Sequence, residues 1–164
     1  MPGKAERNIQ VLFLCTGNTC RSPIAKIIFE DMLSRSELRH RVSAESAGTG
    51  AAGGGPASSL AVEVCREHGL ELSGHKSKTL TEKLIADSDL IIVMQASHEA
   101  YLRQTMSADV KKIRLLGDFA REPGKNKDIE DPFGGTKEQY ESTFSQIKNS
   151  LEGLLVSLTE LYNL

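Results

Sequence analysis

The sequence lacks the features that would direct it to a membrane, to a secretory pathway or to a nucleic acid. Its formal net charge is only -2 at pH 7, so no general electrostatic pull draws it to nucleic acid or to an anionic membrane, and any anion site must be local. No apolar run approaches the length of a membrane span, and residues 1–7 hold no apolar core of a signal peptide. We therefore expect a cytoplasmic protein with no nucleic-acid or membrane partner.

Cysteine is scarce, and its spacing excludes several kinds of site. Cys15, Cys20 and Cys65 form no CxxC pair and no cluster with histidine at zinc spacing, so we expect no metal and no other cofactor. An odd number of cysteines in a chain without an export signal indicates free thiols in a reducing compartment. These thiols are therefore available for chemistry.

What the chain does contain is an alternation of buried strands and helices. Apolar runs predict strands, and helical periodicity with N-cap signals at Ser22, Thr79, Ser97 and Thr136 predicts helices between and after them. The predicted strands cover residues 9–14, 42–46, 89–94 and 112–116. The alternation predicts an α/β fold, with a single domain over residues 9–164 and a loose tail over residues 1–8. A four-stranded parallel sheet would carry helices on both faces.

The first predicted strand ends at a cysteine, and an arginine follows with five residues between them. The whole segment is Cys15, Thr16, Gly17, Asn18, Thr19, Cys20, Arg21 and Ser22. Pro23 then suits the first turn of a helix. Backbone N–H groups of such a loop converge on one tetrahedral oxyanion. In a parallel sheet, ligands bind beyond the carboxyl ends of the strands, and Cys15 lies at such an end.

Cys15 and Arg21 give this loop the groups needed for phosphoryl transfer. The helix N-terminus, Arg21 and the Ser22 hydroxyl all stabilise the thiolate form of Cys15, which is the nucleophilic form. Arg21 offers two parallel donors to phosphoryl oxygens. The alternative is a buried strand-end cysteine beside a surface arginine. The apolar strand before the loop and Pro23 after it favour catalysis.

A leaving group also needs a proton, and Asp131 is the candidate donor. It stands before Pro132 in the long loop over residues 117–135, and proline restricts the residue that precedes it. A carboxyl group held there can act first as general acid. It can then serve as base for the water that hydrolyses a phosphocysteine. From spacing alone, an ordinary Asp-Pro turn remains the alternative.

Together these motifs resemble the low-molecular-weight protein tyrosine phosphatase family over essentially the whole chain after residue 9. Residues 15–23 match the family's phosphate loop, and Asp131-Pro132 matches its general-acid loop. We call residues 15–22 the phosphate loop and residues 130–135 the acid loop. The resemblance implies phosphorylated protein substrates, with Cys15 as nucleophile, Arg21 as phosphate clamp and Asp131 as acid. It also implies that Asn18, Ser46 and His75 form a hydrogen-bond network that holds the phosphate loop in shape.

Within that family the chain looks most similar to the protein arginine phosphatases. Those carry threonine at the position of Thr19, where tyrosine-specific members usually carry isoleucine, and they share the Asp-Pro-Phe-Gly-Gly sequence that begins at Asp131. The Thr19 hydroxyl suits a polar substrate, and Phe133 can stack on a guanidinium face. The glycine-rich residues 48–55 hold no aromatic residue to wall a phosphotyrosine ring.

Other interpretations stay open at this level. The same site fits a tyrosine phosphatase. An arsenate reductase on this fold would need a relay of cysteines, and no cysteine follows Cys65. A catalytically silent anion-binding or redox-sensing module is a further alternative. Cys20 can trap an oxidised Cys15 as a disulfide, or it can be a small buried residue in a tight loop.

Overall fold

The computed structural model describes residues 7–122, 124 and 126–164, so most of the expected tail over residues 1–8 lies outside the described residues. The strands are β1 (Ile9–Cys15), β2 (Val42–Gly48), β3 (Leu90–Val93) and β4 (Ile113–Leu115). The α-helices are α1 (Arg21–Ser34), α2 (Ser59–Glu67), α3 (Glu82–Asp87), α4 (Ala96–Thr105) and α5 (Lys137–Tyr162). Short 3-10 helices cover Glu37–His40, Val110–Lys112 and Leu116–Phe119. The strands pair in parallel in the order β2-β1-β3-β4, which confirms the predicted sheet.

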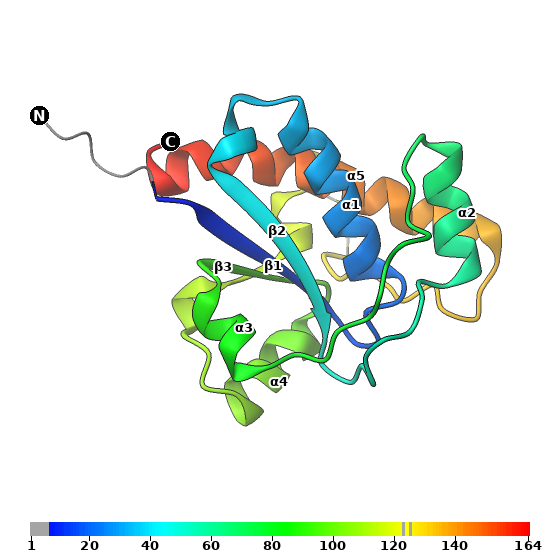
Figure 1. Cartoon of the computed structure of the whole chain (residues 1–164), viewed down its shortest axis with the longest axis horizontal. Coiled ribbons are helices and arrows are strands. Elements are labelled where there is room, and N and C mark those ends of the chain that lie inside the picture. Colours follow the sequence, from blue (N-terminus) through cyan, green and yellow to red (C-terminus); the bar gives the residue numbers. More distant parts are fainter. Residues whose placement is uncertain (1–6, 123, 125) are drawn as a thin grey trace, which may run out of the picture.

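Strand β1 is central and is buried on both faces. Its alternate residues Val11 and Phe13 join the larger core cluster with α1, α2 and α5. Leu12 and Leu14 join the smaller cluster on the other face, with residues of α3 and α4. Figure 1 shows α1 and α5 on one side of the sheet and α3 and α4 on the other. A nearly continuous apolar run is therefore needed, because every residue of this strand except the half-buried Gln10 is buried.

The carboxyl ends of β1 and β2 lie side by side, where Cys15 pairs with Gly48. Strand β2 runs two residues past its predicted end because the chain stays close to β1 there. A Cβ atom at Gly48 would lie 2.5 Å from the carbonyl oxygen of Thr16, so only glycine fits. The next two residues continue this contact: Thr49 N–H donates to Cys15 O (3.0 Å) and Gly50 N–H to Thr16 O (2.9 Å).

The predicted helix starts are right in one case and displaced in three. Thr136 and Gln139 form the expected reciprocal capping box at the start of α5. Ser22 is not an N-cap: α1 begins at Arg21, with Cys20 in the cap position and no side-chain cap. Gln95, not Ser97, caps α4, and Thr81, not Thr79, caps α3. Ser22 and Thr79 instead bond to other segments of the chain.

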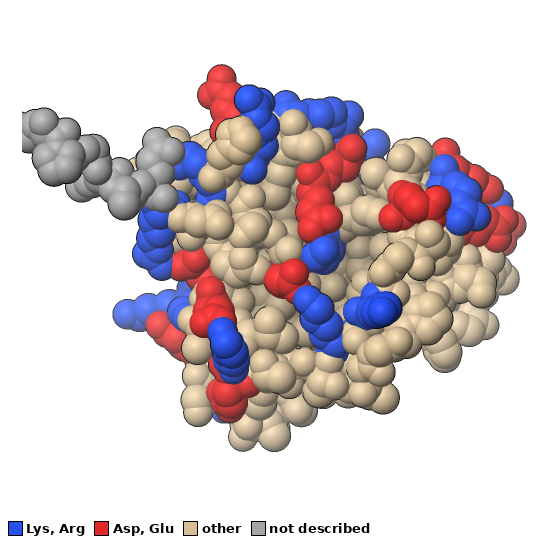
Figure 2. Space-filling model, viewed as in Figure 1, with Lys and Arg blue, Asp and Glu red and all other residues tan. Residues whose placement is uncertain are grey.

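The surface carries both signs of charge side by side. On the face shown in Figure 2, basic and acidic side chains are interspersed. The ion pairs of the described residues include Lys26 with Glu30 and Lys137 with Glu63. Among the described residues, no helix combines the length and the apolar character needed to cross a bilayer.

Candidate active site

A cleft of about 330 Å³ opens at the carboxyl end of β1. The phosphate loop forms its floor, and the acid loop forms the opposite wall. The lining residues are Cys15, Thr16, Gly17, Thr19, Cys20, Arg21, Asp131 and Phe133. The structure therefore brings together two segments that lie more than a hundred residues apart in the sequence.

Asn18 lies at the centre of the network that shapes the phosphate loop. Its backbone is left-handed, with φ of 55°, a conformation that asparagine tolerates better than most residues. The side-chain amide donates to Ser22 Oγ (2.8 Å) and to Ser46 Oγ (3.0 Å). Its Oδ1 accepts from Lys78 N–H (2.8 Å), and its carbonyl oxygen accepts from His75 Nε2 (2.7 Å). The loop is thus held from β2 and from the segment around residues 75–78.

The Cys15 thiol is buried and lies 2.9 Å from Ser22 Oγ. Because Asn18 donates to that hydroxyl, the O–H proton of Ser22 is free to point at sulfur or at the Ala47 carbonyl, 3.4 Å away. This explains why Ser22 does not cap α1. The helix N-terminus itself has no side-chain cap, so its first N–H groups remain available to an anion in the cleft.

Arg21 is buried, with a side-chain exposure of 2%, and it is held along one edge. Nη1 donates to Gln95 Oε1 (2.7 Å) and to the Ile129 carbonyl (2.9 Å). Nη2 lies 3.5 Å from Asp131 Oδ2, and Nε has no hydrogen-bond partner within the described part of the chain. A buried donor left unpaired costs about 1–3 kcal/mol. An oxyanion in the cleft would satisfy it.

Asp131 and Phe133 are held much more loosely. The Asp131 side chain is 46% exposed, and its Oδ1 accepts from the N–H of Phe133 (3.1 Å) in a turn within the acid loop. Phe133 lines the cleft but is 70% exposed. The loop then closes on α5 through Gly134, with φ of 76°, and through Gly135 N–H to Pro132 O at 2.8 Å.

Two polar residues of this site, Gln95 and His98, were missed by the sequence analysis. His98 Nδ1 accepts from the N–H of Gln95 (3.1 Å), so Nε2 carries the proton and donates to Thr16 Oγ1 (3.0 Å). Burial, and then the charge of Arg21, lower the pKa of His98 to about 4, so its ring stays neutral near pH 7. Their position just after β3, at the same edge of the sheet as Cys15, was the available signal.

The buried Cys20 side chain contacts the N-cap residue of α2 and a residue of α5. Its thiol lies 3.3 Å from Ser58 Oγ and 3.3 Å from the Tyr140 hydroxyl. Burial and the bond to Cys20 raise the pKa of Tyr140 to about 12. Cys15, Cys20 and Cys65 are all free thiols. Burial raises the pKa of Cys65 to about 12, which makes this thiol unreactive.

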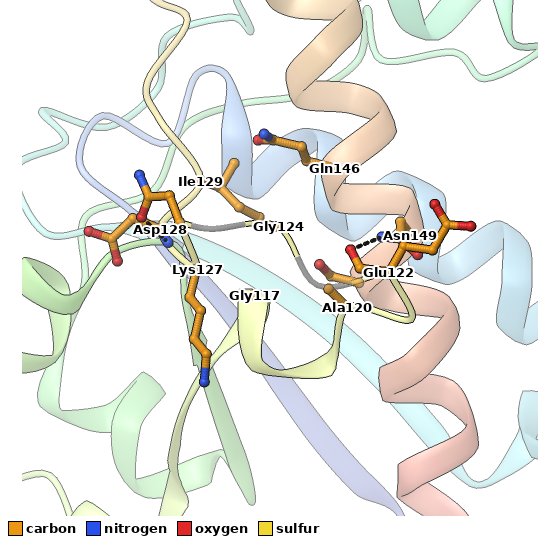
Figure 3. A pocket seen from close by; sticks show the side chains of 11 residues that line it. Gly117, Ala120, Glu122, Gly124, Lys127, Asp128, Ile129, Gln146 and Asn149 are labelled. Carbon is orange, nitrogen blue, oxygen red and sulfur yellow. Dashed lines mark hydrogen bonds between the residues drawn. The ribbon is translucent and has the colours of Figure 1, made fainter.

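A second cavity, of about 130 Å³, is lined by residues of the segments 117–122 and 126–129, by Gly124 and by α5. Figure 3 shows its labelled side chains, with Asn149 donating to the carbonyl oxygen of Glu122. The described residues that line it include neither a thiol nor a guanidinium group. The described residues also hold no group of three or more His, Cys, Asp or Glu side chains arranged as metal ligands. The phosphate-loop cleft, which brings Cys15, Arg21 and Asp131 together, is the candidate active site.

The sequence profile described as "Low molecular weight phosphotyrosine protein phosphatase" matches residues 10–163. A protein-arginine-phosphatase of Bacillus subtilis is 33% identical over 150 residues, which cover 92% of this chain and 97% of that protein. Low molecular weight protein-tyrosine phosphatase A of Mycobacterium tuberculosis is 35% identical over 148 residues, covering 89% of each.

The fold is also similar to solved structures. One is the YwlE arginine phosphatase with a phosphorylated active site serine, at a TM-score of 0.85 and 31% identity. The match covers 94% of this chain and 99% of that one.

Proposed function

The chain belongs to the low molecular weight phosphotyrosine protein phosphatase family and is a cysteine-dependent protein phosphatase, and we propose that it hydrolyses phosphoarginine in proteins through a phosphocysteine intermediate. The observation that carries the proposal is the composition of the cleft. Thr19 stands beside Cys15 on its floor, and Asp131 and Phe133 form its outer wall. A carboxylate, a hydroxyl and an aromatic face suit a planar cation better than an aryl ring.

The first half of the reaction transfers the phosphoryl group to sulfur. Cys15 Sγ attacks phosphorus, while the loop N–H groups and the Nε and Nη2 donors of Arg21 hold the phosphoryl oxygens. The P–N bond breaks as Asp131 donates a proton to the departing guanidinium nitrogen. Free arginine side chain leaves, and the phosphoryl group stays on Cys15.

The second half returns the enzyme to its starting state. The Asp131 carboxylate accepts a proton from water as the water oxygen attacks phosphorus. The S–P bond breaks, inorganic phosphate is released and Cys15 leaves as a thiolate stabilised by the Ser22 hydroxyl at 2.9 Å. The solved relative with a phosphorylated active site serine supports a covalent step of this kind.

The outer wall of the cleft supports arginine over tyrosine. The carbonyl oxygen of the protonated Asp131 carboxyl group can accept from a guanidinium N–H, and the exposed Phe133 ring is free to stack on the guanidinium face. Thr19 has a hydroxyl where isoleucine would favour an aryl ring. A tyrosine phosphatase is the competing candidate, since the mycobacterial relative of that name is 35% identical and the phosphate end of both substrates is the same.

A paired substrate assay tests the proposal. We expect kcat/KM on a phosphoarginine protein to exceed that on a phosphotyrosine peptide. Thr19→Ile should lower the phosphoarginine value about tenfold because it removes the hydroxyl and adds bulk, whereas Thr19→Ser, which keeps the hydroxyl, should retain the preference. A wild-type preference for phosphotyrosine that Thr19→Ile leaves unchanged would show that the arginine assignment is wrong.

Cys20 is the proposed redox partner of Cys15. A peroxide would oxidise the Cys15 thiolate to a sulfenic acid and be reduced to water. The Cys20 thiol would then displace a second water and form the disulfide. To do so, Cys20 must leave Ser58 and Tyr140, each 3.3 Å away. Mass spectrometry after peroxide treatment should find the loss of two hydrogen atoms in wild type, and sulfinic acid at Cys15 in Cys20→Ser.

We also propose that the enzyme is cytoplasmic, because its three cysteines are free thiols, which are typical of a reducing compartment.

A further inference from the structure

One turn at the start of α4 contacts both ends of the phosphate loop. Gln95 Oε1 accepts from Arg21 Nη1 at the far end of the loop (2.7 Å), and His98 Nε2 donates to Thr16 Oγ1 at its near end (3.0 Å). A third hydrogen bond, from Gln95 N–H to His98 Nδ1 (3.1 Å), links these two residues to each other. Together the three hydrogen bonds connect Thr16 to Arg21 across the opening of the phosphate loop. We call this set of hydrogen bonds the bracket.

We propose that Gln95 and His98 are positioning residues, which fix the distance between the first residue of the phosphate loop and its arginine. Neither side chain lines the cleft, so both act through Thr16 and Arg21. The inference rests on the phosphatase function proposed above. It does not depend on which amino acid carries the phosphoryl group.

The bracket is itself anchored to the rest of the protein. The N–H of Ala96 donates to Asp128 Oδ1 (3.0 Å), and the N–H of Ile129 donates to Met94 O (2.8 Å). The carbonyl group of that same Ile129 accepts from Arg21. The turn therefore cannot shift without breaking bonds to the 128–129 segment, which makes it a firm support.

The Thr16 side chain is held by the turn at Gln95–His98 and not by β2. Its backbone carbonyl is fixed from the β2 side, by Gly50 N–H at 2.9 Å and by the close approach of Gly48. That contact involves only the backbone of Thr16 and leaves its side chain without a partner on the β2 side. His98 comes from the segment after β3, the strand that flanks β1 on the side away from β2, and its bond to the Thr16 hydroxyl constrains the loop start on that second side.

The histidine ring is suited to this role because its two nitrogens are used in opposite senses. Nδ1 accepts from Gln95 and Nε2 donates to Thr16, an arrangement that requires the neutral ring. Burial and the nearby charge of Arg21 keep the ring neutral, against the weaker opposing charges of Asp128 and Asp131. The bracket therefore stays intact over the pH range in which the phosphate loop must bind dianions.

Two near-isosteric variants separate positioning from simple stabilisation. His98→Asn places an acceptor near the position of Nδ1 and keeps the hydrogen bond to Gln95, but it loses the hydrogen bond to Thr16. His98→Gln places a donor near the position of Nε2 and keeps the hydrogen bond to Thr16, but it loses the hydrogen bond to Gln95. Each variant loses one neutral hydrogen bond, so their melting temperatures should fall similarly. Ser97→Ala, at the exposed neighbouring position, is the matched control.

The readouts are hydrolysis of 4-nitrophenyl phosphate and inhibition by orthovanadate, a mimic of the transferring phosphoryl group. We expect His98→Asn to lower kcat/KM and to weaken vanadate inhibition about tenfold, and His98→Gln to change each less than about threefold. In a Thr16→Val background, His98→Asn should cost almost nothing further, since its partner is gone. Equal losses in the two variants, a larger loss in His98→Gln, or full additivity with Thr16→Val would overturn the inference.

The outcomes also separate this inference from the proposed function. If wild type hydrolyses neither the aryl phosphate nor a phosphoprotein, the phosphatase assignment fails. Orthovanadate binding to the same variants, measured by calorimetry, would still decide whether His98 positions the loop.

Discussion

The phosphate loop and the acid loop reach the same cleft but are held in opposite ways. Asn18 and Arg21 are buried, and the phosphate loop is bonded to β2, to α4 and to the 75–78 segment. In the acid loop, Asp131 and Phe133 are largely exposed, and the best hydrogen bond of Asp131 is to its own loop. One region is fixed before substrate arrives, and the other can adjust to it.

This difference fits the two tasks of a phosphatase. Phosphoryl transfer depends on donors that are already in place around the anion, and the anion is the same for every substrate. The proton donor, in contrast, must reach a leaving group whose size and charge vary. Substrate preference can therefore change in the acid loop, and at Thr19 beside it, while the phosphate loop keeps its geometry.

The largest effect should come from removing the group that the rigid loop presents. Cys15→Ser should lower kcat/KM at least about 1,000-fold, because a serine hydroxyl is a far poorer nucleophile at neutral pH. Cys65→Ala, which changes a thiol that is buried in the core, should keep the wild-type kcat/KM while lowering the melting temperature. Steady-state assays and thermal denaturation measure both. Comparable losses of activity in the two variants would argue that Cys15 has only a structural role.

The next largest effect should separate chemistry from binding in the acid loop. Asp131→Asn should lower kcat on phosphoprotein about 100- to 1,000-fold, because it removes the proton donor. Inhibition by inorganic phosphate should stay within about threefold, since the phosphate loop is untouched. Asp118→Asn is a matched control, because its carboxylate has the same 46% exposure and pairs with Lys127. An unchanged kcat in Asp131→Asn would contradict the assignment.

A smaller effect should show how strongly the phosphate loop is held. Asn18→Ala removes three side-chain hydrogen bonds at a residue with φ of 55°, and should lower the free energy of unfolding by about 3 kcal/mol. Asn163 has nearly the same φ, 52°, but ends α5 at the surface. Asn163→Ala should therefore cost less than about 1 kcal/mol. Urea denaturation of both gives the comparison, and equal costs would mean that the Asn18 network contributes little.

The smallest effect concerns pH. The pKa of His98 is lowered from 6.5 to about 4 in the folded protein, first by burial and then by Arg21. The unfolded chain therefore binds a proton at His98 before the folded one does, and stability falls as pH drops through this window. Between pH 7 and pH 5 the loss from His98 should be about 2 kcal/mol. Measured by urea denaturation, the free energy of unfolding should fall more steeply with decreasing pH in wild type than in His98→Asn. The variant should still show a smaller fall, because the pKa of His75 is also lowered. Parallel pH curves for the two proteins would contradict a neutral, buried His98.

The features that could be predicted from sequence are those that depend on patterns of neighbouring residues. The apolar run of β1, the Cys15 to Arg21 spacing and the Thr136 capping box each lie within a few neighbouring residues. Ser22 was misassigned because its hydroxyl is recruited by Asn18 and Cys15, which a local cap signal does not reveal. Gln95 and His98 reach the phosphate loop from 74 and 82 residues away. Their contacts depend on strand order, which the sequence leaves open.

The most direct test of phosphoarginine hydrolysis is an internal competition. A phosphoarginine protein and a phosphotyrosine peptide at equal concentration are mixed with a limiting amount of enzyme, and the two products are followed by mass spectrometry. The ratio of their initial rates gives the ratio of kcat/KM without separate assays. We predict that the initial rate of phosphoarginine hydrolysis exceeds that of phosphotyrosine hydrolysis by at least about tenfold, and that Thr19→Ile lowers this ratio. Earlier consumption of phosphotyrosine, with a ratio that Thr19→Ile does not alter, would contradict it.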